Sequence, residues 1–198
     1  VLYVSDGQGG YKSGVAWNGL TSVTENPSGA ESTPLYADNV KYLNMLSSED
    51  FGATIEAYTY PDEFMECDGS ASVTAGVVIG QQTRTTFAMC YRTLKGNDVA
   101  GTGLGYNLHI IFNATASPSS KAYSTVNESP EAMTFSWEVS TTPVPVEGFK
   151  PTASIVIDST KVEAPKLKQL EDKLYGAESA EPTMPTIAEI IAIFKQGA

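Results

Sequence analysis

The sequence contains one histidine and two cysteines, and both scarcities exclude classes of site. His109 alone cannot supply an HExxH motif or another metal site built on several histidines. Cys67 and Cys90 do not form a CxxC motif and provide no framework of disulfides, so we expect a reducing compartment. No apolar run approaches the ~20 residues that a membrane-spanning helix needs, so we expect a soluble protein with no membrane partner.

Basic residues are also scarce. The chain has 12 Lys and Arg against 23 Asp and Glu, for a formal net charge of −11. The first 70 residues hold 11 of the acids and only two lysines, Lys12 and Lys41, so the acidic surface is asymmetric. This sign of charge excludes a protein that grips phosphates, because stable nucleic-acid binding depends on Lys and Arg.

The chain lacks a starting methionine and opens at Val1 in a strand-like pattern. We therefore expect the native N-terminus, with an N-terminal arm, to lie upstream. A length of 198 residues fits one domain over 1–198. Its organisation divides into a strand-rich part, 1–162, and a helical C-terminal segment, 163–198.

Most of the chain alternates apolar and polar residues with the period of two that is typical of strands with one buried face. Clusters of Gly, Pro, Asn and Ser separate these stretches. About eight strands predict a β-sandwich or barrel. The clearest strands are 104–116, 135–140, 87–92 and 55–58, with 33–43 and 152–162 less regular.

Three segments have helical signatures. Over 163–176, leucines recur at helical spacing between Pro165 and Gly176, which suit a helix start and end. Over 186–195, Thr186 and Glu189 form a capping box before a stripe formed by Ile187, Ile190, Ile191 and Phe194. Residues 61–66 predict a short helix. The acidic linker between the C-terminal helices lets them pack loosely on each other, or on a neighbouring subunit.

No catalytic or metal motif stands out. His109 lacks a GxSxG partner motif, and we expect it to be solvated or at an interface. The acids of 62–68 fail the calcium-loop spacing and predict a solvated face. Gly101–Gly105 lacks the GxGxxG spacing and predicts a flexible hairpin loop. Tyr36, Tyr42, Tyr58 and Tyr60 fit a core or a subunit interface equally well.

Motifs in a shared order resemble the major tail tube proteins of long non-contractile-tailed phages and related prophages. The resemblance covers about residues 14–195. The N-terminal motifs are Gly14-Val15-Ala16-Trp17-Asn18-Gly19-Leu20, Thr24-Glu25-Asn26-Pro27-Ser28-Gly29-Ala30-Glu31, Leu35-Tyr36-Ala37-Asp38-Asn39-Val40-Lys41-Tyr42 and Ala57-Tyr58-Thr59-Tyr60-Pro61-Asp62-Glu63-Phe64. The later ones are Cys90-Tyr91-Arg92-Thr93, Gly96-Asn97-Asp98, Gly105-Tyr106-Asn107-Leu108-His109, Ser117-Pro118-Ser119, Asn127-Glu128-Ser129-Pro130-Glu131-Ala132, Ser136-Trp137-Glu138, Thr141-Thr142-Pro143 and Ile157-Asp158-Ser159-Thr160-Lys161.

The resemblance implies a mainly β (α+β) fold, a two-sheet β-sandwich or barrel with a flanking α-helix and C-terminal helices. It implies a structural virion protein, made in the host bacterial cytoplasm and assembled into the tail, with no catalytic residue, cofactor or metal. Six copies would form a ring, and stacked rings a tube with a negatively charged lumen that DNA crosses during ejection. Its partners would be the tape-measure protein, the tail terminator and distal tail proteins.

Two sets of residues are candidates for roles in such a tube. Asp38, Glu56 and Glu138 lie on the polar side of strand-like segments and are candidates for the lumen. The loops 61–69 and 96–105 are candidates for ring stacking. From these loops the residues Asp62, Glu63, Phe64, Asn97 and Asp98 are singled out.

Two other classes of function remain as alternatives. One is a virion-borne carbohydrate-binding or glycoside-hydrolysing β-sandwich, which needs two fixed carboxylates in a cleft. The other is an adhesion or decoration module on the outside of a particle, which would bind a glycan without forming a tube.

Overall fold

The structure is a computed structural model that describes residues 1–99, 101–121, 123 and 132–195. It is mainly β, with 46% of residues in strands and 15% in helices, as the sequence predicts. The elements are β1 (Leu2–Val4), β2 (Leu20–Glu25), β3 (Ser28–Gly29), β4 (Ser32–Ala37), β5 (Val40–Leu46), β6 (Glu49–Asp50), β7 (Gly52–Ala57), η1 (Asp62–Phe64), α1 (Met65–Asp68), β8 (Ala71–Thr74), β9 (Val77–Ile79), β10 (Phe87–Asn97), β11 (Gly101–Ala116), β12 (Phe135–Thr141), β13 (Ser154–Asp158), α2 (Ala164–Tyr175) and α3 (Ile187–Lys195).

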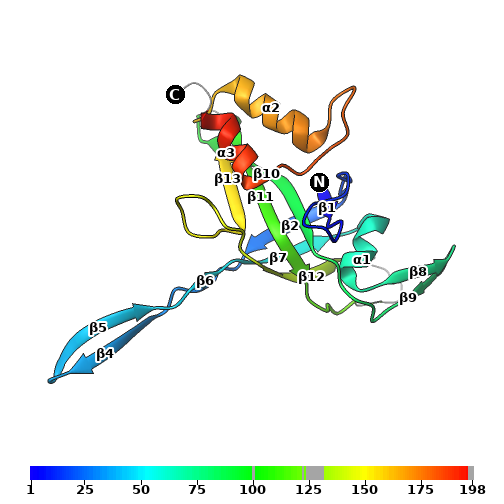
Figure 1. The fold of residues 1–198 in the computed structure, drawn as a ribbon. Coiled ribbons are helices and arrows are strands. Elements are labelled where there is room, and N and C mark those ends of the chain that lie inside the picture. Colours follow the sequence, from blue (N-terminus) through cyan, green and yellow to red (C-terminus); the bar gives the residue numbers. More distant parts are fainter. Residues whose placement is uncertain (100, 122, 124–131, 196–198) are drawn as a thin grey trace.

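The main sheet has seven antiparallel strands in the order β1-β10-β11-β12-β7-β2, with β13 also paired to β11 (Figure 1). One edge of β11 pairs with β10. The other pairs first with β13 through residues 107–111 and then with β12 through residues 114–116. Both halves of the sheet therefore belong to one hydrogen-bonded system. The described strands do not close into a barrel.

A β-bulge separates the two halves of β11. The register passes from Phe87 opposite Ala114 to Met89 opposite Ile111, so two residues of β11 face one residue of β10. One of the two, Asn113, has a positive φ of 46° and exchanges hydrogen bonds with the Tyr11 hydroxyl. Because a bulge bends its strand, β11 can serve two diverging half-sheets.

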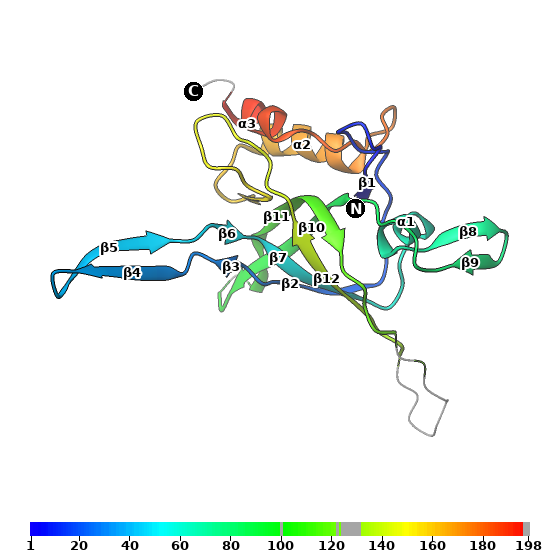
Figure 2. The same cartoon turned by 60° about the horizontal axis from the view of Figure 1, so that its bottom comes forward.

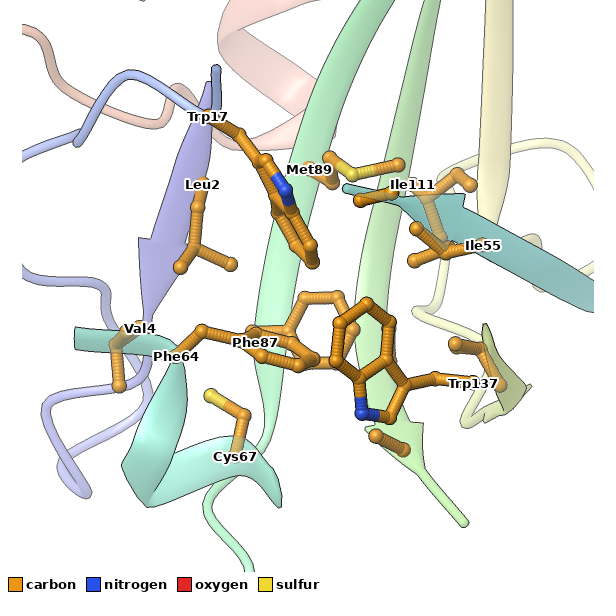
Figure 3. Packing of buried hydrophobic residues seen from close by; sticks show 14 residues of the cluster. Leu2, Val4, Trp17, Ile55, Phe64, Cys67, Phe87, Met89, Ile111 and Trp137 are labelled. Carbon is orange, nitrogen blue, oxygen red and sulfur yellow. The ribbon is translucent and has the colours of Figure 1, made fainter. Parts of the chain in front are cut away.

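Aromatic side chains fill the angle between the half-sheets (Figure 3). Trp17 precedes β2, Phe64 ends η1, Phe87 begins β10 and Trp137 lies in β12. The centroid of the Phe64 ring lies 4.6 Å from that of Trp17, 5.0 Å from that of Trp137 and 5.4 Å from that of Phe87. Phe64 therefore joins four separate segments at the centre of this core.

Helices α2 and α3 cover the opposite face of β10 and β11 (Figure 2). The sequence predicts one buried face for 87–92, but Ala88 and Cys90 on the other face are also buried, because the helices pack on them. The helices contribute Leu167, Leu170, Leu174, Ile187, Ile190 and Ile193 to this second core. They therefore pack on the sheet of their own chain.

Both C-terminal helices have the ends that the sequence predicts. Pro165 stands in the first turn of α2, and Gly176 follows its last residue with a φ of 83°. The capping box of α3 forms, because the Thr186 N–H donates to Glu189 Oε2 at 2.9 Å and the Glu189 N–H donates to Thr186 Oγ1 at 3.3 Å. The predicted stripe is shifted: Ile193 is buried, whereas Ile191 is only partly buried.

Two hairpins project from the body in opposite directions, β4–β5 at one end and β8–β9 at the other (Figure 2). The predicted single strand over 33–43 is wrong, because the chain reverses at Asp38 and Asn39. Both residues have positive φ values, 51° and 62°, which is the geometry of a two-residue hairpin turn. The predicted loop at 101–105 is wrong too, because these residues begin β11 and pair with the end of β10.

We expect Phe64→Ala to lower the free energy of unfolding by about 3–5 kcal/mol, because it removes the ring that joins four segments. Urea unfolding followed by tryptophan fluorescence measures the change. Asp62→Ala, in the same short helix but exposed, should stay within about 0.5 kcal/mol of the parent. A small loss for Phe64→Ala would contradict this account of the core.

The capping box predicts a pH-dependent contribution to stability. Hydrogen bonding from the Thr186 N–H lowers the pKa of Glu189 below its ordinary value. A lowered folded-state pKa means that the stabilisation is present above the unfolded-state pKa and is lost as the pH falls through the folded-state value. We expect Glu189→Gln to be less stable by about 0.5 kcal/mol at pH 7 and equal to the parent at pH 2.5, by thermal unfolding. A constant difference across this range would contradict the prediction.

Candidate functional site

A polar face covers the outer side of β2, β7 and β12, away from the aromatic core. Glu56 pairs with Ser22 on one side and with Ser136 on the other, and Thr54 pairs with Glu138. The neighbours of these residues along each strand, such as Ile55 and Trp137, are buried, so alternation directs the polar set outward. We call this set the acidic face; it consists of Ser22, Thr24, Thr54, Glu56, Ser136, Glu138 and Ser140.

The acidic face carries negative charge without any basic residue in its own strands. None of β2, β7 and β12 contains Lys, Arg or His. Glu56 is partly buried and accepts a hydrogen bond from Ser22 Oγ at 2.9 Å, which holds its carboxylate against the sheet. Glu138 is exposed. Hydroxyl groups lie beside both carboxylates in the paired strands, so this surface is polar and negatively charged.

Of the three lumen candidates, the structure brings Glu56 and Glu138 together and separates Asp38 from them. The sequence predicts Asp38 on the polar side of a strand, and this prediction is wrong. It lies in the turn of the projecting β4–β5 hairpin. The sequence does contain a pattern that is typical of this turn. Asp38 and Asn39 are adjacent residues that tolerate positive φ, and they lie between two apolar runs.

The ring-stacking candidates do not form one surface. Phe64 is fully buried in the aromatic core, so its assignment to a stacking loop is wrong. Asp62 and Glu63 are exposed in η1, beside the start of β10. Asn97 and Asp98 lie at the other end of β10, ten residues further along an extended strand, or about 33 Å away.

The β4–β5 hairpin is an exposed apolar surface, of which the sequence indicates only Tyr36 and Tyr42 as candidate interface residues. All its strand residues are exposed. Tyr36 and Tyr42, left open between core and interface, are 70% and 77% exposed, whereas Tyr60 packs against the aromatic core. The other exposed apolar side chains of the hairpin are Leu35, Val40, Leu43, Met45 and Leu46.

Asp68 is buried, although its segment predicts a solvated acidic face. Its carboxylate accepts a hydrogen bond from Trp137 Nε1 at 3.0 Å and pairs with Lys121 Nζ at 2.5 Å, while Arg84 lies 3.8 Å away. Arg84 also donates to the carbonyl of Cys67 at 3.3 Å and that of Ala116 at 3.0 Å. This ionic cluster ties α1 to β11 and β12.

His109 is not solvated, because its side chain is only 15% exposed. Its ring stacks on Tyr91 with centroids 4.7 Å apart. Nε2 lies 2.8 Å from Thr93 Oγ1, and Nδ1 lies 3.2 Å from Glu25 Oε1, which also accepts from the Tyr91 hydroxyl. Burial, and then Glu25, raises the pKa of Tyr91. The cluster ties the end of β2 to β10 and β11.

The order of carboxylate, imidazole and hydroxyl in this cluster matches a catalytic triad, but a triad also needs oxyanion donors and a substrate cleft. Three surface cavities of about 330–480 Å³ are lined by neither Thr93 nor His109. Neither Glu56 nor Glu138 lines them, so these carboxylates lie on an open face and not in one of these clefts. We interpret the His109 cluster as a structural tether.

Within the described ranges, no three carboxylate, histidine or cysteine side chains gather closely enough to hold a metal ion. In the same part of the chain, no helix combines the length and the apolar character that crossing a bilayer requires. No protein-family model matches the sequence, and no curated protein matches it significantly.

Proposed function

We propose that this chain is the major tail tube subunit of a long non-contractile-tailed phage or related prophage. Six copies form a ring, and stacked rings enclose a negatively charged lumen through which DNA passes during ejection. The observation that carries the proposal is the β4–β5 hairpin, a wholly exposed apolar ribbon on a strongly acidic body. The order of motifs shared with tail tube proteins supports it.

The hairpin has the properties of an assembly element. It contributes no residue to either core, so folding of the monomer does not require its apolar side chains. Contiguous exposed apolar surface of this kind marks an interaction site, and unpaired strand edges favour association. With strands of six and seven residues, the hairpin reaches about 20 Å beyond its base. In a tube built from many copies of one chain, the partner of the hairpin is a neighbouring copy.

The main sheet supplies edges for closing a ring. Its strand order ends at β2, and no described strand pairs with the other edge of β2. At the other end, β1 pairs only with residues 87–89 of β10, so the later part of β10 lies beyond its reach. Joining such edges between six copies removes them from solvent and continues the sheet around the ring.

The acidic face supports the role of a conduit. In a closed ring, the outer side of β2, β7 and β12 is the side free of helices and can line the channel. Carboxylates and hydroxyls there keep DNA phosphates from sticking, so the genome slides through. The proposed partners are the tape-measure protein, the tail terminator and distal tail proteins. The proposed location of the protein is the virion tail.

Negative-stain electron microscopy of the purified, concentrated chain tests the proposal. We expect hollow, striated tubes or six-fold rings. Replacing residues 32–46 by a short Gly-containing turn should remove both, while the thermal unfolding midpoint changes little, because the hairpin packs on neither core. A monomer that binds or hydrolyses a glycan and forms no rings would favour the carbohydrate-active alternative.

Charge reversal on the acidic face tests the conduit. In virions that carry Glu138→Lys, we expect DNA ejection to slow several-fold at unchanged tube length, because each ring then presents cations to the phosphates. Glu178→Lys, a reversal at an exposed position outside the sheet, is the matched control and should leave ejection unchanged. Equal ejection rates for both variants would contradict the assignment of Glu138 to the lumen.

A further inference from the structure

The sequence contains a single Asn-Gly pair, Asn18-Gly19, in the turn that leads into β2. Both residues are exposed, and Gly19 has a φ of 78°. Because glycine has no Cβ, the side chain of the residue before it can approach its backbone nitrogen closely. Asparagine is a thermolabile residue, and this is the position in the chain where its amide meets the least steric hindrance.

The two groups of this turn that can react with each other are free of hydrogen bonds within the described residues. The Asn18 side-chain amide has no partner there, and the Gly19 N–H donates to no acceptor. The carbonyls make the contacts of the turn instead. The Asn18 carbonyl accepts from Thr59 Oγ1 at 2.8 Å, and the Gly19 carbonyl accepts from the Tyr58 N–H at 2.8 Å. The amide can therefore rotate toward the Gly19 nitrogen without losing a side-chain hydrogen bond.

Two Asp-Gly pairs share the open local sequence, but their side chains are held. Asp6 Oδ1 accepts from the backbone N–H groups of Gln8 at 2.7 Å and Gly10 at 3.0 Å. These hydrogen bonds lower the pKa of Asp6 and favour the carboxylate, which is a poor target for a nucleophile. Asp68 is buried and accepts a hydrogen bond from Trp137. Asn18 thus combines exposure, an unbonded side chain and a following glycine.

We propose that Asn18 is a site of spontaneous deamidation, in which Gly19 supplies the nucleophile and water completes the reaction. The Gly19 nitrogen forms a bond to Cγ of Asn18, the Cγ–Nδ2 bond breaks, and the side-chain nitrogen leaves as ammonia with the Gly19 proton. Water then opens the cyclic imide. Opening at Cγ gives aspartate, whereas opening at the backbone carbonyl carbon gives isoaspartate. Both products carry a new carboxylate, and the site does not depend on the proposed tube function.

The isoaspartyl product weakens the junction between the start of β2 and the end of β7. It lengthens the main chain by one methylene between two residues whose carbonyls are held by 58–59. Trp17, directly before them, donates from Nε1 to the Thr59 carbonyl at 2.9 Å and belongs to the aromatic core. The hydrogen bonds between 17–19 and 58–59 cannot all keep their geometry at the longer spacing.

Peptide mapping by mass spectrometry, after incubation of the folded chain in mildly alkaline buffer, tests the site. We expect the peptide that contains Asn18 to gain the mass difference between OH and NH₂ before any other asparagine peptide does, and to separate into aspartyl and isoaspartyl forms. Asn18→Gln is the matched control and should keep its mass, because its longer side chain must close a larger ring. A folded chain that keeps the Asn18 amide while the urea-unfolded chain loses it would overturn the proposal.

Thermal unfolding of the incubated protein provides a second readout. We expect the isoaspartyl fraction to unfold about 2–4 °C below the fresh parent, as the loss of one hydrogen bond implies for a chain of this size. Freshly prepared Asn18→Asp adds the same charge without the extra methylene and should unfold with the fresh parent. An unchanged midpoint in a sample shown to contain isoaspartate would overturn the weakened junction.

Discussion

The structure depends on one strand serving two half-sheets. β11 is 16 residues long and pairs along one edge with β13 and then with β12. The bulge at Phe112 and Asn113 turns the strand between these pairings. The angle that results is wide enough for a cluster of aromatic rings on one side, while the other side receives two helices. Both faces of the first part of β10 and of the later part of β11 are consequently buried.

Two polar clusters hold the parts of this arrangement in place. Asp68 ties α1 to β11 and β12 through Trp137, Lys121 and Arg84. Glu25 ties the last residue of β2 to β10 and β11 through Tyr91 and His109. The Asp68 cluster lies directly before the β8–β9 hairpin, whereas β3 lies between Glu25 and the β4–β5 hairpin.

Local patterns in the sequence predict both C-terminal helices and the strands β7, β10, β11, β12 and β13, but not the β4–β5 and β8–β9 hairpins. The helices, their capping residues and the long strands follow from periodicity and from Pro, Gly and Thr at their ends. The errors are of two kinds. Asp38 and Phe64 were misassigned because a turn divides 33–43 and because an aromatic residue beside two acids has no local signature of burial. The sequence predicts a solvated face for Asp68 and a solvated or interface position for His109, because the partners that surround both residues are distant in sequence.

The amino-acid sequence alone establishes a mainly β chain with helical C-terminal segments and an acidic N-terminal third, because periodicity, capping and charge are local properties. Only the tertiary structure decides which polar residues share a face and which apolar residues stay outside the core. Glu56 and Glu138 become neighbours through the pairing of β7 with β12. The two apolar hairpins remain exposed because neither hydrophobic core includes them. The sequence pattern within a hairpin cannot predict this, because it does not show which other segments fill the cores.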